Sequence, residues 1–306
     1  MTEFDPTNGR YTDVHFDRLA EGRIVRITLN RPAAHNAQTR RMLVELDQAF
    51  REAEADDVVR VVILAAAGRS FSAGHDMGSP AAVEEMLPGP GQHPTMNIDG
   101  GRRDGVVEQR FLQEWQYYFQ NTKRWRELRK ITIAEVHGHV MSAGLMLMWA
   151  CDLIVAAEDA TFADVVGTRL GMCGVEYFGH PWEFGPRRAK ELLLTGDSID
   201  ADEGYRLGMV SKVFPTEQLA ELTEQFAVRI ASRPTMAALL VKDSVNDAVD
   251  QMGFSSSLKH SFMLHQLNHA HWSANNDDKY PAARPGVDID DWQTVGRPKN
   301  AEKSLP

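Results

Sequence analysis

Residues 131–152 constrain the fold of this chain more than any other stretch. A β-favouring run over 131–136 predicts a short strand, and the Ser-Ala-Gly sequence at 142–144 predicts a turn with almost no side-chain bulk. Residues 145–149 are apolar on every side and predict a buried helix. Because a helix N-terminus presents unpaired N–H groups, the stretch predicts either a ligand site or a tight turn that only packs.

The composition indicates a soluble protein and argues against two kinds of partner. The chain has 306 residues, of which 43% are hydrophobic and 25% charged, and this is enough apolar material for a large core. A net charge of −10 argues against a nucleic-acid or membrane-surface partner. Two cysteines in apolar contexts, no signal-peptide pattern and no apolar run long enough to cross a bilayer predict a cytoplasmic location.

Strand and helix patterns alternate along the first two thirds of the chain, which predicts an α/β fold. Residues 11–19 and 23–29 alternate apolar and polar side chains around a Glu-Gly pair and predict a hairpin. A helix capped by Thr39 and an apolar strand at 58–65 then predict a βαβ unit. Further strands are expected at 153–157 and 209–214, and helices at 107–129, 187–194, 200–207, 217–232, 235–252 and 255–271.

Two loops of small residues follow apolar strands, at 72–75 and at 142–144. In a parallel sheet both loops lie at the carboxyl ends of the strands, which is where ligands bind. One backbone N–H from each loop could converge on a single oxygen. Such an oxyanion hole stabilises developing negative charge by roughly 3 kcal/mol per donor.

The common signature motifs of other enzyme classes are absent, including GxGxxG, GxxxxGK[ST], HExxH, GxSxG and CxxC. Their absence weakens the dinucleotide, P-loop, zincin, α/β-hydrolase and thioredoxin interpretations. His137 and His139 form an HxH pair whose spacing would place both on one strand face. A metal site needs a further ligand, so packing or a hydrogen bond explains the pair better and no metal site is predicted.

Four sequence blocks, in this order, resemble the crotonase superfamily, also called the enoyl-CoA hydratase/isomerase family. The blocks are ITLNRP…HNAQT, VVILAAAGRSFSAGHDM, ITIAEVHGHVMSAG…ACDLIVAAEDATF and ELLLTGDSIDADEGYRLGMVSKVFP. The resemblance covers about residues 12–270. It implies a crotonase-type spiral of ββα units with an acyl-CoA site over residues 1–200, a helical C-terminal trimerisation region at 201–272 and a polar tail at 273–306.

The resemblance also implies a set of site residues. Members of the family bind acyl-CoA thioesters and polarise the thioester carbonyl with two backbone N–H groups, which by position are those of His75 and Ala143. The residues that correspond to the coenzyme A contacts are His35, Asn36, Ala37, Ala73, Gly74 and Asp76. Coenzyme A is then part of the substrate, and no separate cofactor is expected.

The resemblance fails where the two catalytic glutamates of the hydratases should lie. Met146 occupies the first place, and Val165 to Gly167 occupy the second. Asp164 and Glu176 are the remaining candidate acids nearby. Asp164 would alternatively serve as a turn or cap residue. Glu176 has apolar sequence neighbours that could raise the pKa of a general acid or base, and it could equally have only a packing role.

The sequence therefore leads to two functional hypotheses. The first is an acyl-CoA enzyme, a lyase or isomerase of the hydratase/isomerase type whose reaction differs from plain hydration. The second is a non-catalytic acyl-CoA-binding or scaffold protein with the same fold. A Pro- and Gly-rich loop at 78–105 is expected to form a wall of the acyl pocket. An aromatic stripe at Trp115, Phe119 and Trp125 predicts either core packing or a subunit contact. Together with the helical C-terminal third, it leads us to expect a homotrimer or homohexamer.

Overall fold

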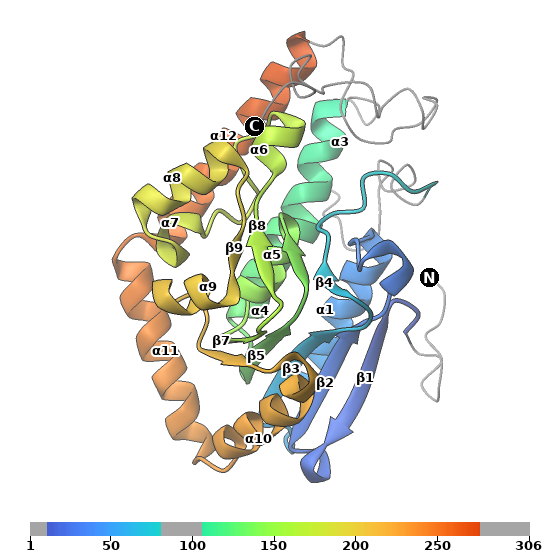
Figure 1. Cartoon of the computed structure of the whole chain (residues 1–306), viewed down its shortest axis with the longest axis vertical. Coiled ribbons are helices and arrows are strands. Elements are labelled where there is room, and N and C mark those ends of the chain that lie inside the picture. The colour runs from blue at the N-terminus through green and yellow to red at the C-terminus, as the bar shows by residue number, and fades with distance from the viewer. Residues whose placement is uncertain (1–10, 81–105, 276–306) are drawn as a thin grey trace.

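The computed structural model describes residues 11–80 and 106–275 and contains two β-sheets with helices around them (Figure 1). The strands are β1 (Val14–Leu19), β2 (Ile24–Leu29), β3 (Val61–Ala66), β4 (Ser70–Ser72), β5 (Ile131–Val136), β6 (His139–Met141), β7 (Leu153–Ala157), β8 (Thr161–Ala163), β9 (Ile199–Asp200) and β10 (Lys212–Phe214). The α-helices are α1 (Arg40–Ala55), α3 (Val106–Gln113), α4 (Asn121–Arg126), α5 (Ala143–Trp149), α6 (Val166–Leu170), α7 (His180–Glu183), α8 (Pro186–Thr195), α9 (Ala201–Leu207), α10 (Leu219–Ala231), α11 (Thr235–Gln251) and α12 (Phe254–Asn275).

The chain winds as a spiral in which the successive strands from β3 to β8 alternate between the two sheets. The larger sheet has the strand order β1-β2-β3-β5-β7-β10, and the smaller has the order β4-β6-β8-β9. Three consecutive strand pairs, β3/β4, β5/β6 and β7/β8, each give one strand to each sheet. In each sheet, the strands that come from successive pairs are parallel neighbours: β3, β5 and β7 in the larger sheet, and β4, β6 and β8 in the smaller. Their carboxyl ends therefore lie at a common edge of each sheet. The predicted α/β fold with ββα units is confirmed.

The N-terminal elements form as the sequence predicts. β1 and β2 are an antiparallel hairpin, and β2 pairs with β3 in parallel across α1. The Thr39 hydroxyl accepts a hydrogen bond from the backbone N–H of Met42 at 3.2 Å and so caps α1. The apolar face of α1 is buried, as its helical spacing predicts.

The larger sheet is covered on both faces, which is why β3 is apolar throughout. One face packs into the main core with α1, α4 and α5. The other face, which includes Ile63 and Ile133, packs against Leu219 and Ala227 of α10. Every residue of α5 is buried, which confirms the buried helix predicted at 145–149.

Several predicted boundaries are wrong for identifiable reasons. β4 and β6 were not predicted, because three-residue strands are too short to show a periodic pattern. The predicted helix at 107–129 ends at Arg126 and contains a π-helical segment, η4 (Glu114–Gln120), between α3 and α4. The predicted strand at 209–214 is shorter in the structure, where β10 covers only Lys212–Phe214. Gly208 ends α9 in a left-handed conformation, and the residues that follow it bend the chain before the strand begins.

The aromatic stripe packs largely in the core, which is one of the two alternatives that the sequence left open. Phe119 is fully buried and Trp125 is 1% exposed. Phe119 packs on Phe262 of α12, and Trp125 packs on Phe50 of α1. These aromatic side chains therefore join elements of one chain and carry no argument for assembly.

The C-terminal helices wrap around one side of the sheets, with α12 lying against α3 (Figure 1). A buried ion pair fixes α11, because the Lys242 Nζ lies 3.0 Å from the Asp152 Oδ2 next to α5. In the described ranges, no helix has the length and apolar character needed to cross a membrane. The predicted pocket wall at 78–105 and the tail at 273–306 lie almost wholly outside the described residues, and the division at residues 200 and 272 stays a prediction.

Candidate functional site

The two small-residue loops meet at the carboxyl ends of β4 and β6, as the sequence predicts. β4 and β6 are parallel neighbours, so the loops that follow them lie side by side. A Cβ on Gly74 would lie 3.3 Å from the backbone nitrogen of Ala143, and a Cβ on Gly144 would lie 2.7 Å from the backbone oxygen of Ser72. Glycine suits both positions, because a Cβ on residue 144 would collide with the Ser72 backbone and residue 74 has a φ of 94°.

Each loop presents one backbone N–H group that local structure leaves available. Gly74 and Asp76 bond to Gln38 through their backbone oxygen and nitrogen, so the N–H of His75 between them points to the opposite side. Ala143 is the first residue of α5, and its N–H has no partner within the helix. Ser142, the residue before it, is held at φ 48° and ψ −114° by its bond to the Ala163 oxygen, a strain typical of functional sites.

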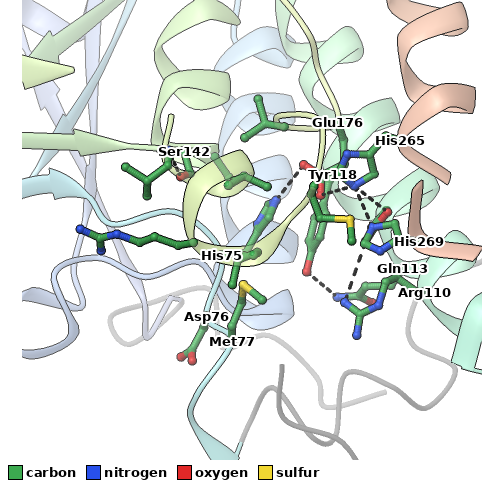
Figure 2. Close-up of a pocket in the computed structure, with 18 of the residues that line it drawn as sticks. His75, Asp76, Met77, Arg110, Gln113, Tyr118, Ser142, Glu176, His265 and His269 are labelled. Atoms are coloured by element: carbon green, nitrogen blue, oxygen red, sulfur yellow. Dashed lines mark hydrogen bonds and ion pairs between the residues drawn. The ribbon is translucent and has the colours of Figure 1, made fainter. Parts of the chain in front are cut away.

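Both loops open into one cavity, whose lining combines a set of apolar side chains, the apolar wall, with a set of polar ones, the polar wall. Figure 2 shows His75, Glu176, His265 and His269 gathered in this lining. The side chains of the apolar wall are Met77, Val165, Val166, Leu170, Met172 and Val175. Those of the polar wall are Arg110, Gln113, Glu114, Glu176, His265 and His269. His75 and Ala143 lie in the same lining, so the predicted donors and the predicted acid Glu176 come together here.

Glu176 points from the loop before α7 toward the His75 side chain (Figure 2). One carboxylate oxygen, Oε2, lies 3.3 Å from the His75 Nε2, and the other, Oε1, lies 3.7 Å from the His265 Nε2. The carboxylate thus faces two imidazoles, although its sequence neighbours are apolar. The His75 ring is fixed by stacking on Tyr118, with ring centroids 3.5 Å apart. This arrangement places a carboxylate able to move a proton beside the two loops.

Three polar residues of this wall, Glu114, His265 and His269, were missed by the sequence analysis. Glu114 begins the π-helical segment, and the two histidines lie one turn apart on α12. Burial would raise the pKa of Glu114, but His269 and His265 outweigh it and hold that pKa well below its usual value. The i,i+4 histidine pair on a predicted helix was the one sequence signal that could have found them.

Asp164, the second candidate acid, holds the loop that leads to Glu176. It is 3% exposed, and its Oδ2 accepts hydrogen bonds from the His180 ring at 2.9 Å and from the backbone N–H of Val175 at 3.1 Å. Burial would raise the pKa of Asp164, but the bond with His180 outweighs it and lowers that pKa. Asp164 is absent from the described cavity lining, and these bonds fit the alternative turn-and-cap role.

The residues that correspond to coenzyme A contacts lie in two hydrogen-bonded turns beside the cavity, and among them only Asn36 and Gly74 are buried. Asn36 is fully buried, and its amide nitrogen donates to the backbone oxygens of Ala67 and Ser70. The His35 Nδ1 lies 3.0 Å from the Ser70 hydroxyl, and the Ala37 backbone oxygen accepts a bond from the Arg31 guanidinium. These bonds tie the turn after β2 to β4.

Ala73, Gly74 and Asp76 lie in the second of these turns, beside the cavity. Ala73 donates its N–H to the His35 backbone oxygen at 2.9 Å, and Ala73 and Asp76 belong to the lining. Asp76 pairs with Arg31 at 3.0 Å and caps the following turn. The loop that carries the His75 N–H is thus held on both sides, and contact with coenzyme A itself stays a prediction for all six residues.

The two positions where the resemblance predicts glutamates differ in whether they reach the cavity. Met146 is 2% exposed and packs in the main core, away from the described lining. Val165 and Val166 line the cavity directly, so one assigned place is open to a ligand but carries no titratable group. His137 bonds to the Gly68 oxygen and His139 to the Thr161 hydroxyl. His137 lies between β5 and β6 and His139 begins β6, so the two do not share one face of a single strand.

Sequence and structure comparisons point to the same kind of protein. The family profile described as enoyl-CoA hydratase/isomerase matches residues 20–89 and 103–277. The chain is 61% identical over 293 residues to EchA13 of Mycobacterium tuberculosis, which carries a provisional assignment as an enoyl-CoA hydratase; the match covers 96% of this chain and 92% of that protein. It is 33% identical over 227 residues to the mitochondrial enoyl-CoA hydratase of Pongo abelii, covering 73% of this chain and 69% of the relative.

A solved structure extends this similarity to three dimensions. The crystal structure of a provisionally assigned enoyl-CoA hydratase from Mycobacterium smegmatis superposes with a TM-score of 0.76 at 38% identity. The match covers 88% of this chain and 99% of that protein. The spiral of paired strands described above is therefore the crotonase fold.

Proposed function

This chain belongs to the enoyl-CoA hydratase/isomerase family, and from that premise we propose that it is an acyl-CoA enzyme, a lyase or isomerase that moves a proton next to a thioester carbonyl. The thioester oxygen accepts hydrogen bonds from the backbone N–H groups of His75 and Ala143. These two donors stabilise the negative charge that develops when a proton leaves the adjacent carbon, by about 3 kcal/mol each. Coenzyme A enters as part of the substrate in a cytoplasmic reaction.

Glu176 is the group that takes or returns the proton. The observation that carries this assignment is the place of its carboxylate in the same cavity as the two donor loops, 3.3 Å from the His75 ring. Met146 and Val166, at the places of the usual hydratase glutamates, cannot transfer protons. Because neither usual glutamate place carries a proton-transferring group, we expect Glu176 to move a proton along the acyl chain or to help expel a group rather than to add water.

Deuterium uptake tests this proposal for any acyl group, because it needs only a proton that exchanges beside the thioester. The purified protein is incubated in D₂O with a panel of saturated and enoyl-CoA thioesters, and mass spectrometry follows both deuterium uptake and product formation. We expect at least one thioester to exchange or to be converted, because the oxyanion hole stabilises the enolate that exchange requires. Incubation of the same panel without protein is the control.

The panel also distinguishes the second hypothesis from the first. Thioesters that bind, measured by calorimetry, without exchange or conversion would assign the chain to non-catalytic acyl-CoA binding. If no thioester binds, the assignment of the cavity to acyl-CoA is wrong.

We also propose that the chain assembles as a homotrimer or homohexamer. The support comes from exposed apolar side chains on the two C-terminal helices, in place of the aromatic stripe. They are Met236, Leu240, Val241 and Val245 on α11 and Met263, Leu264 and Leu267 on α12, between 47% and 68% exposed. Surfaces of this kind mark protein contacts in soluble proteins.

Light scattering of the native chain should give the mass of a trimer or of a hexamer. Leu240→Glu places a charge in the apolar face and is expected to shift the mass toward the monomer. Leu194→Glu is the matched control, because Leu194 is 80% exposed on α8 and lies outside this face. A monomeric native chain at micromolar concentration would contradict the proposal.

A further inference from the structure

Glu114, His265 and His269 form a buried cluster of metal-ligating side chains that the proposed reaction does not use. All three line the polar wall of the cavity, and all are less than 4% exposed. Figure 2 shows His265 and His269 side by side on this wall. One ligand atom of each residue lies within 4.8 Å of the others. The two histidines lie one turn apart on the same face of α12, and Glu114 reaches them from the π-helical segment, a type of helix often found at functional sites.

The distances within this cluster match those between ligands of a single ion. The two Nε2 atoms are 2.8 Å apart, and the His269 Nε2 lies 2.9 Å from the Glu114 Oε1. The His265 Nε2 lies 3.5 Å from the Glu114 Oε2. Ligand atoms bound at about 2.0–2.2 Å to one ion are separated by about 2.9 Å at right angles and about 3.4 Å in a tetrahedron. An ion could therefore bind all three residues with little movement of the side chains.

The partners of the ligands prepare them for this role. The His265 Nδ1 lies 2.8 Å from the Gly174 backbone oxygen, which can only accept, so Nδ1 carries the hydrogen of that bond. The lone pair of a neutral His265 then lies on Nε2, which faces the cluster. The Gln266 amide holds the Glu114 Oε2 at 2.6 Å. Bonds of this kind to the outer atoms of ligands are the usual support of metal sites.

The charges around the cluster favour a cation. Glu176 adds a second carboxylate, whose Oε1 lies 3.7 Å from the His265 Nε2. The Arg110 guanidinium lies 3.9 Å from the Glu114 Oε1 and opposes it. Burial lowers the pKa of His265, but its bonds with Cys173 and Glu114 outweigh burial and raise that pKa well above its usual value, so an ion would have to replace a proton on this imidazole. Once that proton has left, two carboxylates against one guanidinium leave one negative charge for the ion to neutralise.

We propose that Glu114, His265 and His269 bind a divalent transition-metal ion at the edge of the acyl cavity. Two imidazoles and one carboxylate are a donor set that suits Zn²⁺, Co²⁺, Ni²⁺ and Fe²⁺, and three protein ligands leave a coordination position open. That position faces the cavity, so it would take water or an oxygen of a bound acyl group. The inference concerns the metal site alone and stands whether or not Glu176 transfers a proton.

Metal titration of tag-free protein tests the site directly. The chain is treated with a chelator, dialysed, and titrated with ZnCl₂ in a calorimeter and with CoCl₂ in a visible spectrometer. We expect one equivalent of each metal per chain and a rise in Tm with Zn²⁺, because an ion that binds only the folded state stabilises it. His269→Ala and the double variant His265→Ala/His269→Ala should weaken Zn²⁺ binding by about 100-fold or more.

Two exposed histidines of the same helix supply matched controls. His260→Ala and His271→Ala remove an imidazole from α12 outside the cavity lining and should leave the Zn²⁺ affinity unchanged. Equal Zn²⁺ affinity in the native chain and in the double variant would overturn the proposal, and so would the absence of stoichiometric binding. If the cluster variants fail to fold, crystals of the native chain are soaked in ZnCl₂ instead. An anomalous peak among the three residues would support the metal site, and the absence of a peak there would overturn it.

Discussion

Glu176→Gln is expected to lower kcat by about 10²–10⁴-fold, the usual contribution of a positioned general acid or base. Glutamine keeps the shape of the side chain and one oxygen near the His75 ring, but it cannot take or give a proton. Binding of the thioester should stay within a few fold, because the backbone donors of His75 and Ala143 are untouched. The measurements are the rates of deuterium uptake and conversion for the best thioester of the panel, with its Kd from calorimetry.

Two other acids provide the comparison for this variant. Asp164→Asn should lower the thermal stability more than the rate, because the Asp164 carboxylate holds the loop before Glu176 through His180 and Val175. Glu183→Gln removes a carboxyl outside the described lining, whose pKa burial raises to about 7, and should leave kcat unchanged. An unchanged kcat in Glu176→Gln with a large loss in Asp164→Asn would move the acid–base role to Asp164. If neither Glu176→Gln nor Asp164→Asn lowers kcat, the oxyanion hole would be the only catalytic group left among the candidates.

Ala143→Pro is expected to lower kcat by about 10²–10³-fold, the cost of removing one oxyanion donor. Proline has no backbone N–H, so the thioester oxygen keeps only the donor of His75. The first position of a helix is the one that best tolerates proline, but proline also restricts Ser142 before it, whose φ of 48° and ψ of −114° it disfavours, so the fold of the variant is checked separately. The rate of deuterium uptake measures the effect, and circular dichroism with Tm checks the fold.

Ala143→Gly is the control that isolates the N–H group. Glycine lacks the methyl group but keeps the donor, and its cost to helix stability is below about 1 kcal/mol. The glycine variant should therefore retain most of the activity that the proline variant loses. If turnover survives in Ala143→Pro, or is lost equally in Ala143→Gly, the oxyanion assignment is wrong.

Much of the fold could be predicted because its elements are long enough to carry a pattern. The apolar spacing along α1, its Thr39 cap and the alternation in the first hairpin all formed as expected. The convergence of the two small-residue loops also followed from the sequence, because strands in a parallel sheet end at one edge. The short strands β4 and β6 could not be predicted, since three residues fit many patterns.

Candidate site residues could be chosen from the sequence only where they lie close to a recognisable sequence block. His75, Ala143 and Glu176 were chosen for their place after shared sequence blocks, and they line one cavity. His35, Asn36 and Ala37 were chosen in the same way, but their local bonds to Ser70, Ala67 and Arg31 give each a structural role as well. A sequence block gives the neighbourhood of a residue, and the direction of its side chain depends on packing.

By itself the sequence determined the α/β class, the family, the buried central helix and the two neighbouring loops of small residues, because each depends on local periodicity or on the order of neighbouring blocks. Only the tertiary structure decided what faces the cavity. It brought Glu176 to His75 across 101 residues and Glu114 to the helix of His265 and His269 across more than 150. It also placed Asp164 in hydrogen bonds that hold the loop before Glu176. The aromatic side chains Phe119 and Trp125 became buried by packing on other elements of the same chain. Contacts between distant segments leave no periodic trace, because they arise from how the helices pack on the sheets.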